Sequence, residues 1–246
     1  MVGGVTRRGD SLRRSWRLLQ AFRLEQPEPE VFYAVMAADT VRMVGAHGTL
    51  AGKTVVDVGA GPRQYAEAFV HAGSRYVAVD HCADALDRLR HPLAHALIAT
   101  GMQLPMASGS VDVAISCNVF EHVEEPERLA DELVRITAPG GLIVLSYTNW
   151  LSPWGGHETS PFHYLGGDRA VRRYERVYGR PPKNLAGTTL HKTSVEQGLR
   201  WARGAREVDL VEARPRYYPR WTRGVLRVPG AREILTWNLW MVLRKR

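Results

Sequence analysis

Two glycines and a carboxylate stand together early in the chain. Residues 54–62 read T-V-V-D-V-G-A-G-P, so Asp57 closes a valine-rich run and Gly59 and Gly61 follow it. A short apolar run that breaks into glycines is typical of a buried strand, a tight turn and the start of a helix. Because glycine has no Cβ, such a turn lets a ligand approach the main chain closely. The pattern predicts a ligand-binding turn.

A second carboxylate follows at a distance that indicates the kind of ligand. Asp80 ends the apolar run at residues 75–80, nineteen positions after Gly61. In nucleotide-binding βαβ units an acidic residue about twenty positions after the glycines binds the ribose hydroxyls. The ligand is therefore expected to carry an unphosphorylated ribose. A dinucleotide is disfavoured, though still open, because G-x-G-x-x-G would need glycine where the chain has Gln64.

The order of several short blocks resembles a known family. D-V-G-A-G-P at 57–62 is followed by V-A-V-D at 77–80, L-P-M at 104–106, C-N-V-F-E-H-V at 117–123 and P-G-G at 139–141. This series, over about residues 50–148, resembles the class I S-adenosylmethionine-dependent methyltransferases of type 11. The resemblance implies an α/β, Rossmann-like fold, in which a seven-stranded, mostly parallel sheet has an antiparallel last strand and is flanked by helices.

The resemblance also implies which residues bind S-adenosylmethionine. In place of the Asp that usually follows the third strand and binds adenine, this chain has Thr100, which puts adenine recognition in question. The cofactor-binding positions implied are Asp57, Gly59, Gly61, Asp80, His81, Thr100, Gly101, Met102, Asn118 and Val119.

Histidines supply candidate catalytic groups. Methyl transfer to a hydroxyl requires removal of a proton, which a histidine or a metal ion can accomplish. In quinone-type O-methyltransferases, the pair that matches Glu121 and His122 helps to hold a divalent metal, so the resemblance implies a metal site, for example for Mg²⁺. His157 and His163 are further candidates for the base. The alternatives are a helix-start pair that fixes the backbone and polar packing within a loop.

The acceptor is expected to bind to the aromatic segment after the fifth strand. Aromatic faces beside polar side chains suit a hydroxyl-rich ligand. The candidate acceptor-binding residues are Tyr33, Trp150, Trp154, Glu158 and Tyr164. The whole chain resembles actinobacterial methyltransferases, including sugar O-methyltransferases of mycobacterial methylmannose polysaccharide synthesis, which implies an oligosaccharide or other small-molecule acceptor. Methylation of a quinone or lipid at a membrane surface, and a non-catalytic cofactor-binding or RNA-associated protein, remain as alternatives.

Composition bounds these interpretations. With 246 residues, of which 45% are hydrophobic, the chain is expected to form one domain. Its parts are an N-terminal helical extension (1–48), a cofactor-binding core (50–148), an acceptor-binding insertion (149–193) and the C-terminal part of the sheet (194–246). Two cysteines far apart and the lack of a long apolar run predict reduced thiols in a cytoplasmic protein. A homo-oligomer is left open.

Charge is distributed unevenly along the chain. The net charge is +8, yet residues 168–246 hold 19 Lys and Arg against 7 Asp and Glu. Such a basic region suits an acidic partner or peripheral contact with a membrane, and a solvated basic surface is the plain alternative. Nucleic-acid binding is not expected, because no sequence-reading motif accompanies the arginines.

Hydrophobic periodicity and turn residues predict the elements that position these groups. Helices are expected at residues 10–24, 30–44, 63–72, 84–90, 127–137, 171–178 and 194–203. Strands are expected at 54–58, 75–80, 96–99, 111–116, 142–147, 207–214 and 236–243, with a long excursion at 215–235 between the last two.

Overall fold

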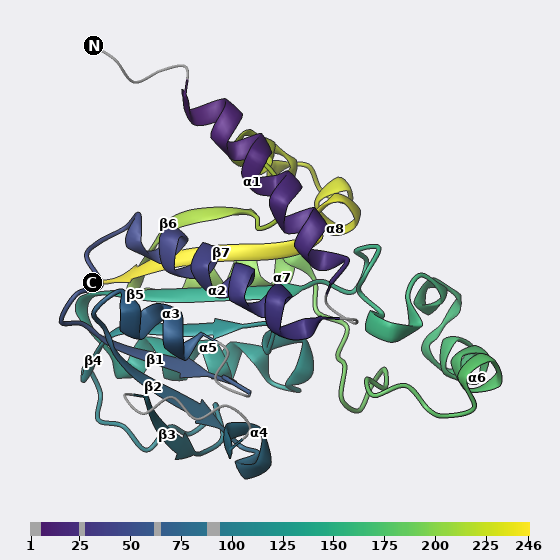
Figure 1. Ribbon diagram of the computed structural model, residues 1–246, viewed down its shortest axis with the longest axis horizontal. Coiled ribbons are helices and arrows are strands. Elements are labelled where there is room, and N and C mark those ends of the chain that lie inside the picture. Colours follow the sequence, from purple (N-terminus) through teal and green to yellow (C-terminus); the bar gives the residue numbers. More distant parts are fainter. Residues whose placement is uncertain (1–5, 25–27, 62–64, 88–93) are drawn as a thin grey trace.

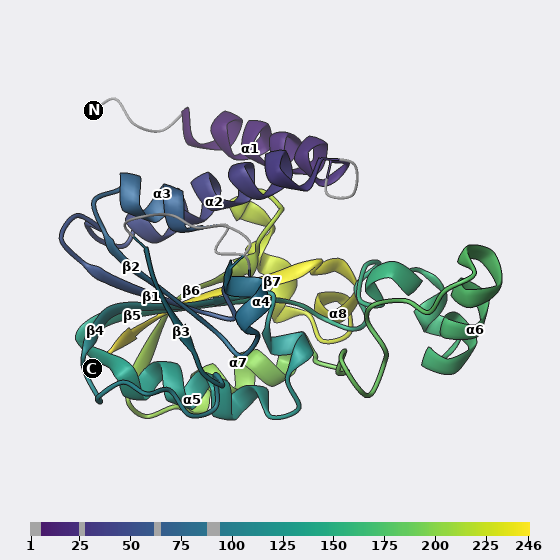
Figure 2. The ribbon, with the colours of Figure 1, turned by 60° about the horizontal axis from the view of Figure 1, so that its bottom comes forward.

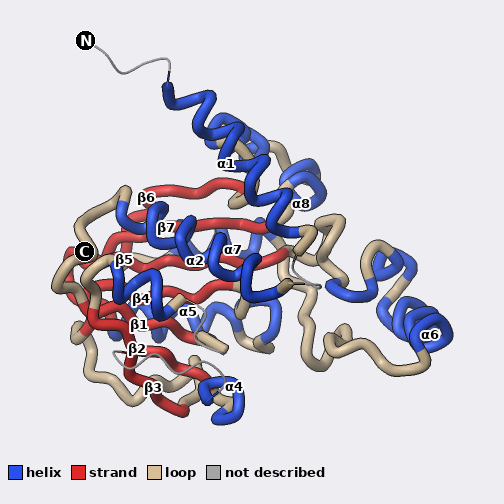
Figure 3. Tube along the Cα trace, in the orientation of Figure 1, coloured by secondary structure: helices blue, strands red, loops and turns tan. Residues whose placement is uncertain are grey.

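A seven-stranded sheet forms the centre of the molecule in the computed structural model, which describes residues 6–24, 28–61, 65–87 and 94–246. The strand order is β3-β2-β1-β4-β5-β7-β6, and Figure 3 shows the strands side by side. β1 to β5 run parallel, whereas β7 pairs antiparallel with both β5 and β6. This order confirms the predicted methyltransferase fold. The chain returns from β3 at the sheet edge to β4 beside β1, which places the carboxyl ends of β1 and β4 next to each other.

The strands agree closely with the sequence pattern. The valine- and isoleucine-rich runs are buried on both faces, as expected of a parallel sheet covered on both sides. Their bounds are β1 Thr54–Val58, β2 Arg75–Asp80, β3 Ala94–Ile98, β4 Val111–Cys117, β5 Thr137–Thr148, β6 Val208–Pro215 and β7 Asn238–Lys245.

Helices cover both faces of the sheet (Figures 1 and 2). On one face, α2 and α3 pack against the sheet and α1 packs on the outer side of α2; on the other face, α5 and α7 pack against the sheet. The helix bounds are α1 Thr6–Phe22, α2 Pro29–Gly45, α3 Ala66–His71, α4 Ala83–Asp87, α5 Pro126–Ile136, α6 Gly167–Tyr178, α7 Val195–Gly204 and α8 Ala231–Leu235. Figure 1 shows α6 projecting away from the sheet, beyond the end of β5.

Several predicted bounds were wrong. α1 covers residues 6–22 instead of 10–24, and α6 begins four residues earlier than expected. β3 covers 94–98 instead of 96–99, and β5 covers 137–148 instead of 142–147, so it includes the predicted Pro-Gly-Gly turn. α3 is shorter than predicted, and the predicted start of this helix at Arg63 lies outside the described residues, as does the predicted end of α4 at Arg90. The excursion at 215–235 contains a 3-10 helix, η4 (Arg220–Arg227), and α8.

Buried arginines fix the N-terminal helices to the sheet. Arg14 of α1 donates two hydrogen bonds, of 2.8 and 2.6 Å, to the carboxylate of Asp39 in α2, and burial of both groups makes this pair costly to break. Arg216, fully buried, donates from Nη1 to the Ser146 hydroxyl of β5 and from Nη2 to the Thr40 hydroxyl of α2. The helices that cover this end of the sheet are therefore held in a defined position.

Among the described helices, none is both long enough and apolar enough to cross a membrane.

Candidate active site

The glycine turn lies at the carboxyl end of β1. Gly59 and Gly61 have φ angles of 77° and 52°, in the left-handed region that glycine adopts without strain. Asp80, at the end of β2, accepts hydrogen bonds of 2.9 Å from the backbone N–H groups of Gly61 and Cys82. Its carboxylate is 9% exposed. The predicted ribose-binding carboxylate thus holds the turn and the start of the following segment in place.

Asp57 lies deeper than Asp80. Its carboxylate is buried and accepts a hydrogen bond from the hydroxyl of Tyr76 on the neighbouring strand. Burial raises the pKa of Asp57 to about 7, because a carboxylate loses its hydration there, and the nearby Asp80 adds to this effect. Asp57 therefore lies in β1 just before the glycine turn, and its carboxylate is bonded to the neighbouring strand β2.

Asn118 and Val119 follow β4 and face the glycine turn. A Cβ placed on Gly59 would come within 2.3 Å of a Val119 methyl carbon, so only glycine leaves room between the two segments. Asn118 has a φ of 58°, unusual for a residue other than glycine. Its side-chain oxygen accepts a 2.8 Å hydrogen bond from the amide of Asn238 in β7. Such strain is typical of segments that are shaped around a ligand.

The remaining predicted cofactor positions also lie at strand ends. Thr100 and Gly101 come directly after β3; Thr100 is exposed, and its hydroxyl accepts a weak 3.4 Å hydrogen bond from the backbone N–H of Met102. His81 is largely exposed, with Nδ1 3.3 Å from a carboxylate oxygen of Asp80. These residues and Asp80 lie at the carboxyl ends of β2 and β3, the edge at which a cofactor site is expected in such a sheet.

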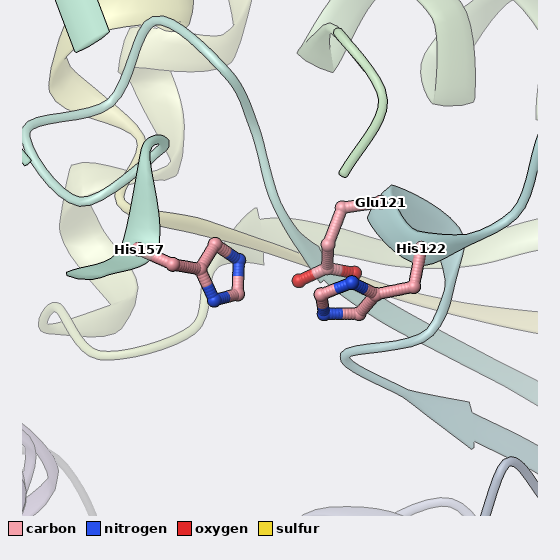
Figure 4. Close-up of side chains that lie close together, drawn as sticks. All are labelled: Glu121, His122 and His157. Atoms are coloured by element: carbon pink, nitrogen blue, oxygen red, sulfur yellow. The ribbon is translucent and has the colours of Figure 1, made fainter. Parts of the chain in front are cut away.

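Glu121, His122 and His157 converge at the acceptor side of this edge (Figure 4). Glu121 and His122 lie in the short 3-10 helix η1 (Phe120–His122), and His157 begins η2 (His157–Thr159) in the segment after β5. One ligand atom from each side chain lies within 4.8 Å of the others, and the two imidazole rings are 5.0 Å apart. The structure therefore brings together three of the predicted catalytic and metal-binding residues.

Fixed backbone groups orient the first two side chains. The carbonyl oxygen of Thr189 lies 2.7 Å from Nδ1 of His122 and can only accept, so Nδ1 carries the proton and neutral His122 has its lone pair on Nε2. Oε1 of Glu121 accepts from the N–H of Thr148, whereas Oε2 is buried without a hydrogen-bond partner. Burial raises the pKa of Glu121. Each residue thus keeps one atom available for a ligand.

His157 is held in an unusual conformation. Its φ is 49°, and its Nε2 is buried without a hydrogen-bond partner. Burial, followed by the proximity of His122, lowers the pKa of His157 to about 4. The imidazole is therefore neutral at physiological pH and can offer a lone pair to a proton or a metal ion.

His163, predicted for catalysis, and Glu158, predicted for acceptor binding, lie elsewhere. His163 is 1% exposed, and its Nε2 is 3.0 Å from the carbonyl oxygen of Trp150 while Nδ1 faces the Ser160 hydroxyl at 3.5 Å. Glu158 accepts two hydrogen bonds from the amide of Asn184. Both residues stabilise the fold of the insertion, because their polar atoms are bonded within it, and neither joins the three converging side chains.

The predicted acceptor-binding aromatics fall into two groups. Trp150 and Tyr164 pack around His163, and the Tyr164 hydroxyl donates to the carbonyl oxygen of Leu151. Trp154 is 41% exposed and stacks on Trp237 at 5.4 Å. Tyr33 lies in α2 with its ring 5.0 Å from that of Phe32. Of these residues, Trp154 and Tyr164 are exposed, Tyr164 at 49%.

The donor atoms of Glu121, His122 and His157 are suited to a divalent metal ion. Two imidazole nitrogens and one carboxylate oxygen suit Zn²⁺ or Fe²⁺, whereas Mg²⁺ prefers oxygen ligands. The hydrogen bond from His122 Nδ1 to a carbonyl is typical of metal-bound histidine, and the buried, unpaired atoms of Glu121 and His157 have room for a further partner. These residues fit a divalent ion, which would lower the pKa of a bound hydroxyl.

Sequence reasoning missed the residues that hold this arrangement. Thr189, Asn184 and Asn238 position His122, Glu158 and Asn118 respectively, and each lies at least 26 positions away from its partner. Their types and local sequence carry no signal that distinguishes them from ordinary polar loop residues. Only tertiary contacts identify them.

Comparison with known proteins agrees with the fold, which is that of the S-adenosylmethionine-dependent methyltransferases. A family model described as "Methyltransferase domain" matches residues 56–145. The chain is 48% identical over 249 residues to an "uncharacterized methyltransferase" of Mycobacteroides abscessus, an alignment that covers 96% of this chain and 95% of that protein. It is 50% identical over 247 residues to one from Mycolicibacterium vanbaalenii, covering 95% of each. The chain belongs to this methyltransferase family.

Solved structures share the fold at low sequence identity. An S-adenosylmethionine-dependent methyltransferase from Mesorhizobium loti has a TM-score of 0.57 at 16% identity, covering 84% of this chain and 98% of that one. A second such protein, from Listeria monocytogenes, has a TM-score of 0.58 at 12% identity, covering 85% and 99%. At such identity these likenesses show the fold alone. Membership of the methyltransferase family, shown by the relatives at 48–50% identity, makes the protein an enzyme that uses S-adenosylmethionine.

Proposed function

We propose that the chain methylates a hydroxyl group of a carbohydrate acceptor. The convergence of Glu121, His122 and His157 carries the proposal, because hydroxyl oxygens become adequate nucleophiles only when their proton is removed. When bound, S-adenosylmethionine supplies an electrophilic methyl group, which the acceptor oxygen displaces from sulfur. The chain has to position the acceptor and take its proton.

His122 is the group best placed to accept that proton. The Thr189 carbonyl fixes Nδ1 as the protonated nitrogen, so Nε2 presents a lone pair toward the acceptor side. When Nε2 takes the proton, the ring becomes an imidazolium beside the carboxyl group of Glu121. An ionised Glu121 would stabilise that cation, and the neutral His157 ring adds no repulsion. Positioning the acceptor can lower the activation barrier by roughly 7–11 kcal/mol. The base contributes less, a factor of about 10²–10⁴ in rate.

The test is methyl transfer from isotope-labelled S-adenosylmethionine to neutral mannosides, quinols and phospholipids, with NMR to locate the new methyl group. We expect O-methylated sugar, and loss of most turnover in His122→Ala. His95→Ala, an exposed histidine on β3, is the matched control. Methylation at carbon or nitrogen would contradict the proposal. Adding EDTA distinguishes two mechanisms. An enzyme in which a histidine removes the proton directly should stay active, whereas a metal-assisted enzyme should lose activity until Mn²⁺, Zn²⁺ or Mg²⁺ is added back.

A second candidate function is methylation of a quinone or lipid at a membrane surface. Exposed apolar side chains lie among arginines on α1 and on the η4–α8 segment, for example Trp16 at 59% and Trp221 at 62%. Tryptophan and arginine on one surface suit the interface of an anionic membrane. Salt-sensitive binding to anionic vesicles, together with methylation of quinols or lipids and not of mannosides, would favour this candidate.

A further inference from the structure

An apolar groove lies between α1 and the segments that carry Tyr217 and Trp237. Its volume is about 210 Å³, and its lining is almost entirely apolar or aromatic, with Ser15 supplying a hydroxyl. Pockets for whole drug-sized ligands measure about 300–1,000 Å³. The groove is therefore of a size to take part of a ligand, such as a short stretch of hydrocarbon chain. Its principal lining residues are Leu12, Trp16, Leu19, Phe22, Tyr218 and Trp237.

The inner wall of the groove packs against the segment that carries His157. Its Trp237 packs against Trp154 at 5.4 Å, and its Phe22 contacts both tryptophans, at 5.2 and 4.9 Å. The carbonyl oxygen of Trp154 accepts a 2.9 Å hydrogen bond from the backbone N–H of His157. Trp237 directly precedes Asn238, whose amide holds Asn118 beside the glycine turn. Both walls of the inner end thus join segments that form the catalytic site.

The outer part of the groove exposes apolar groups. Leu12 is 54% exposed and Trp16 59% exposed. Covering such side chains with hydrocarbon is favourable, at about 25 cal/mol per Å² of apolar surface. A protein partner would need an interface of about 800 Å² on each side, far more than a groove of this size offers. A small apolar groove whose inner wall packs against the His157 segment instead suits an extended alkyl chain.

We propose that this groove binds the hydrocarbon chain of an amphiphilic acceptor and thereby directs its hydroxyl-bearing head to Glu121, His122 and His157. The inference rests on the proposed transfer to a hydroxyl and adds the class of acceptor: a carbohydrate linked to a hydrocarbon chain.

The test measures binding of monomeric n-alkyl β-D-glucosides, from ethyl to octyl, to the full chain by calorimetry, below their micelle concentrations. Kd is expected to fall roughly fourfold for each added methylene until the groove is full. Ser15→Phe, which puts a ring into the groove, should abolish this dependence on chain length. Trp16→Ala, at an exposed position, should weaken it. Gln20→Phe adds the same ring at an exposed position of the same helix outside the groove and should leave it intact.

Three outcomes would overturn the proposal. Kd that does not change with chain length in the wild type excludes a hydrocarbon site. Length dependence that survives in Ser15→Phe places that site elsewhere. The third outcome is that neither protein binds the monomeric glucosides, while wild type and Ser15→Phe bind anionic vesicles equally or self-associate equally. That result would assign the surface around the groove to a membrane or to a second copy of the chain. This test is independent of the proposed function, because binding of the alkyl glucosides to the groove does not require methyl transfer. The groove proposal and the proposed function can therefore fail separately.

Discussion

The two sides of the active site are built in different ways. On the cofactor side, Asp57, Gly59, Gly61 and Asp80 come from two consecutive strands and are held by each other and by neighbouring backbone groups. On the acceptor side, η1, the end of β5, the His157 segment and Thr189 come together from distant parts of the chain. A short stretch of sequence thus encodes one side, and long-range packing the other.

The difference extends to how the polar groups are satisfied. Both carboxylate oxygens of Asp80 accept backbone hydrogen bonds, whereas Oε2 of Glu121 and Nε2 of His157 are buried without a partner. A buried polar atom without a hydrogen bond costs about 1–3 kcal/mol. The acceptor side therefore carries an energetic cost that a substrate, a metal ion or ordered water would relieve. Four predictions test this contrast, in decreasing order of expected effect.

Replacing His157 with asparagine should have the largest effect, on turnover alone. Asparagine tolerates the left-handed backbone at this position, so the change removes the imidazole without adding strain. Because the neutral imidazole of His157 also offers a lone pair to the acceptor proton or to a metal ion, we expect kcat to fall, by up to the factor of about 10²–10⁴ that a general base contributes, with affinity for S-adenosylmethionine nearly unchanged. Steady-state kinetics and calorimetry measure both quantities, with His71→Asn on the exposed end of α3 as the control. Full activity would remove His157 from the mechanism.

Replacing Asp80 with alanine should instead act on the cofactor. The change removes acceptors from two backbone N–H groups and the carboxylate proposed to bind the ribose hydroxyls. Kd for S-adenosylmethionine should rise about 100-fold, since hydrogen bonds to a charged group contribute about 1.5–3 kcal/mol each. Calorimetry measures Kd for this variant and for Asp84→Ala, a control at an exposed position of α4 that should keep the wild-type affinity. An unchanged affinity would refute the ribose assignment.

Asp57 should make stability fall with rising pH. Its pKa is about 7 in the folded chain against an ordinary 3.8, so between about pH 4 and pH 7 the folded state keeps a proton that the unfolded state has released. This contribution is full below about pH 4 and is lost as the pH rises through 7. Between pH 5 and 7 the wild type should lose about 2 kcal/mol relative to Asp57→Asn, by urea unfolding. If the free energy of unfolding changed with pH in the same way in wild type and Asp57→Asn, this prediction would be wrong. The control Asp168→Asn, at an exposed position, should behave as the wild type.

Asn118 should show a small effect where the two sides meet. Alanine at this position loses the hydrogen bond from Asn238 and keeps a left-handed backbone, whereas glycine loses only the hydrogen bond. We expect Asn118→Ala to be less stable than Asn118→Gly by about 1 kcal/mol in urea unfolding. Equal stability of the two variants would show that the backbone is not strained there.

Much of the cofactor side could be predicted from local sequence. The valine run and the glycines encode β1 and its turn, and the distance to Asp80 equals one crossover, so pattern and spacing suffice. The bounds of α1, α6 and β3 were less well predicted, because tertiary packing decides where these elements end. Asp57 was expected beside the cofactor, yet its carboxylate is bonded to Tyr76, a contact that depends on strand register.

For the acceptor side, the sequence supplied the candidate catalytic residues, and the tertiary structure shows which of them lie together. Glu121-His122 follows directly from β4, so its place at the sheet edge could be inferred. Of the two histidines in the later segment, only the structure shows that His157 faces this pair and that His163 is bonded to Trp150. The physical reason is that loop conformation depends on long-range contacts, such as those of Trp154 with Trp237, which local periodicity does not encode.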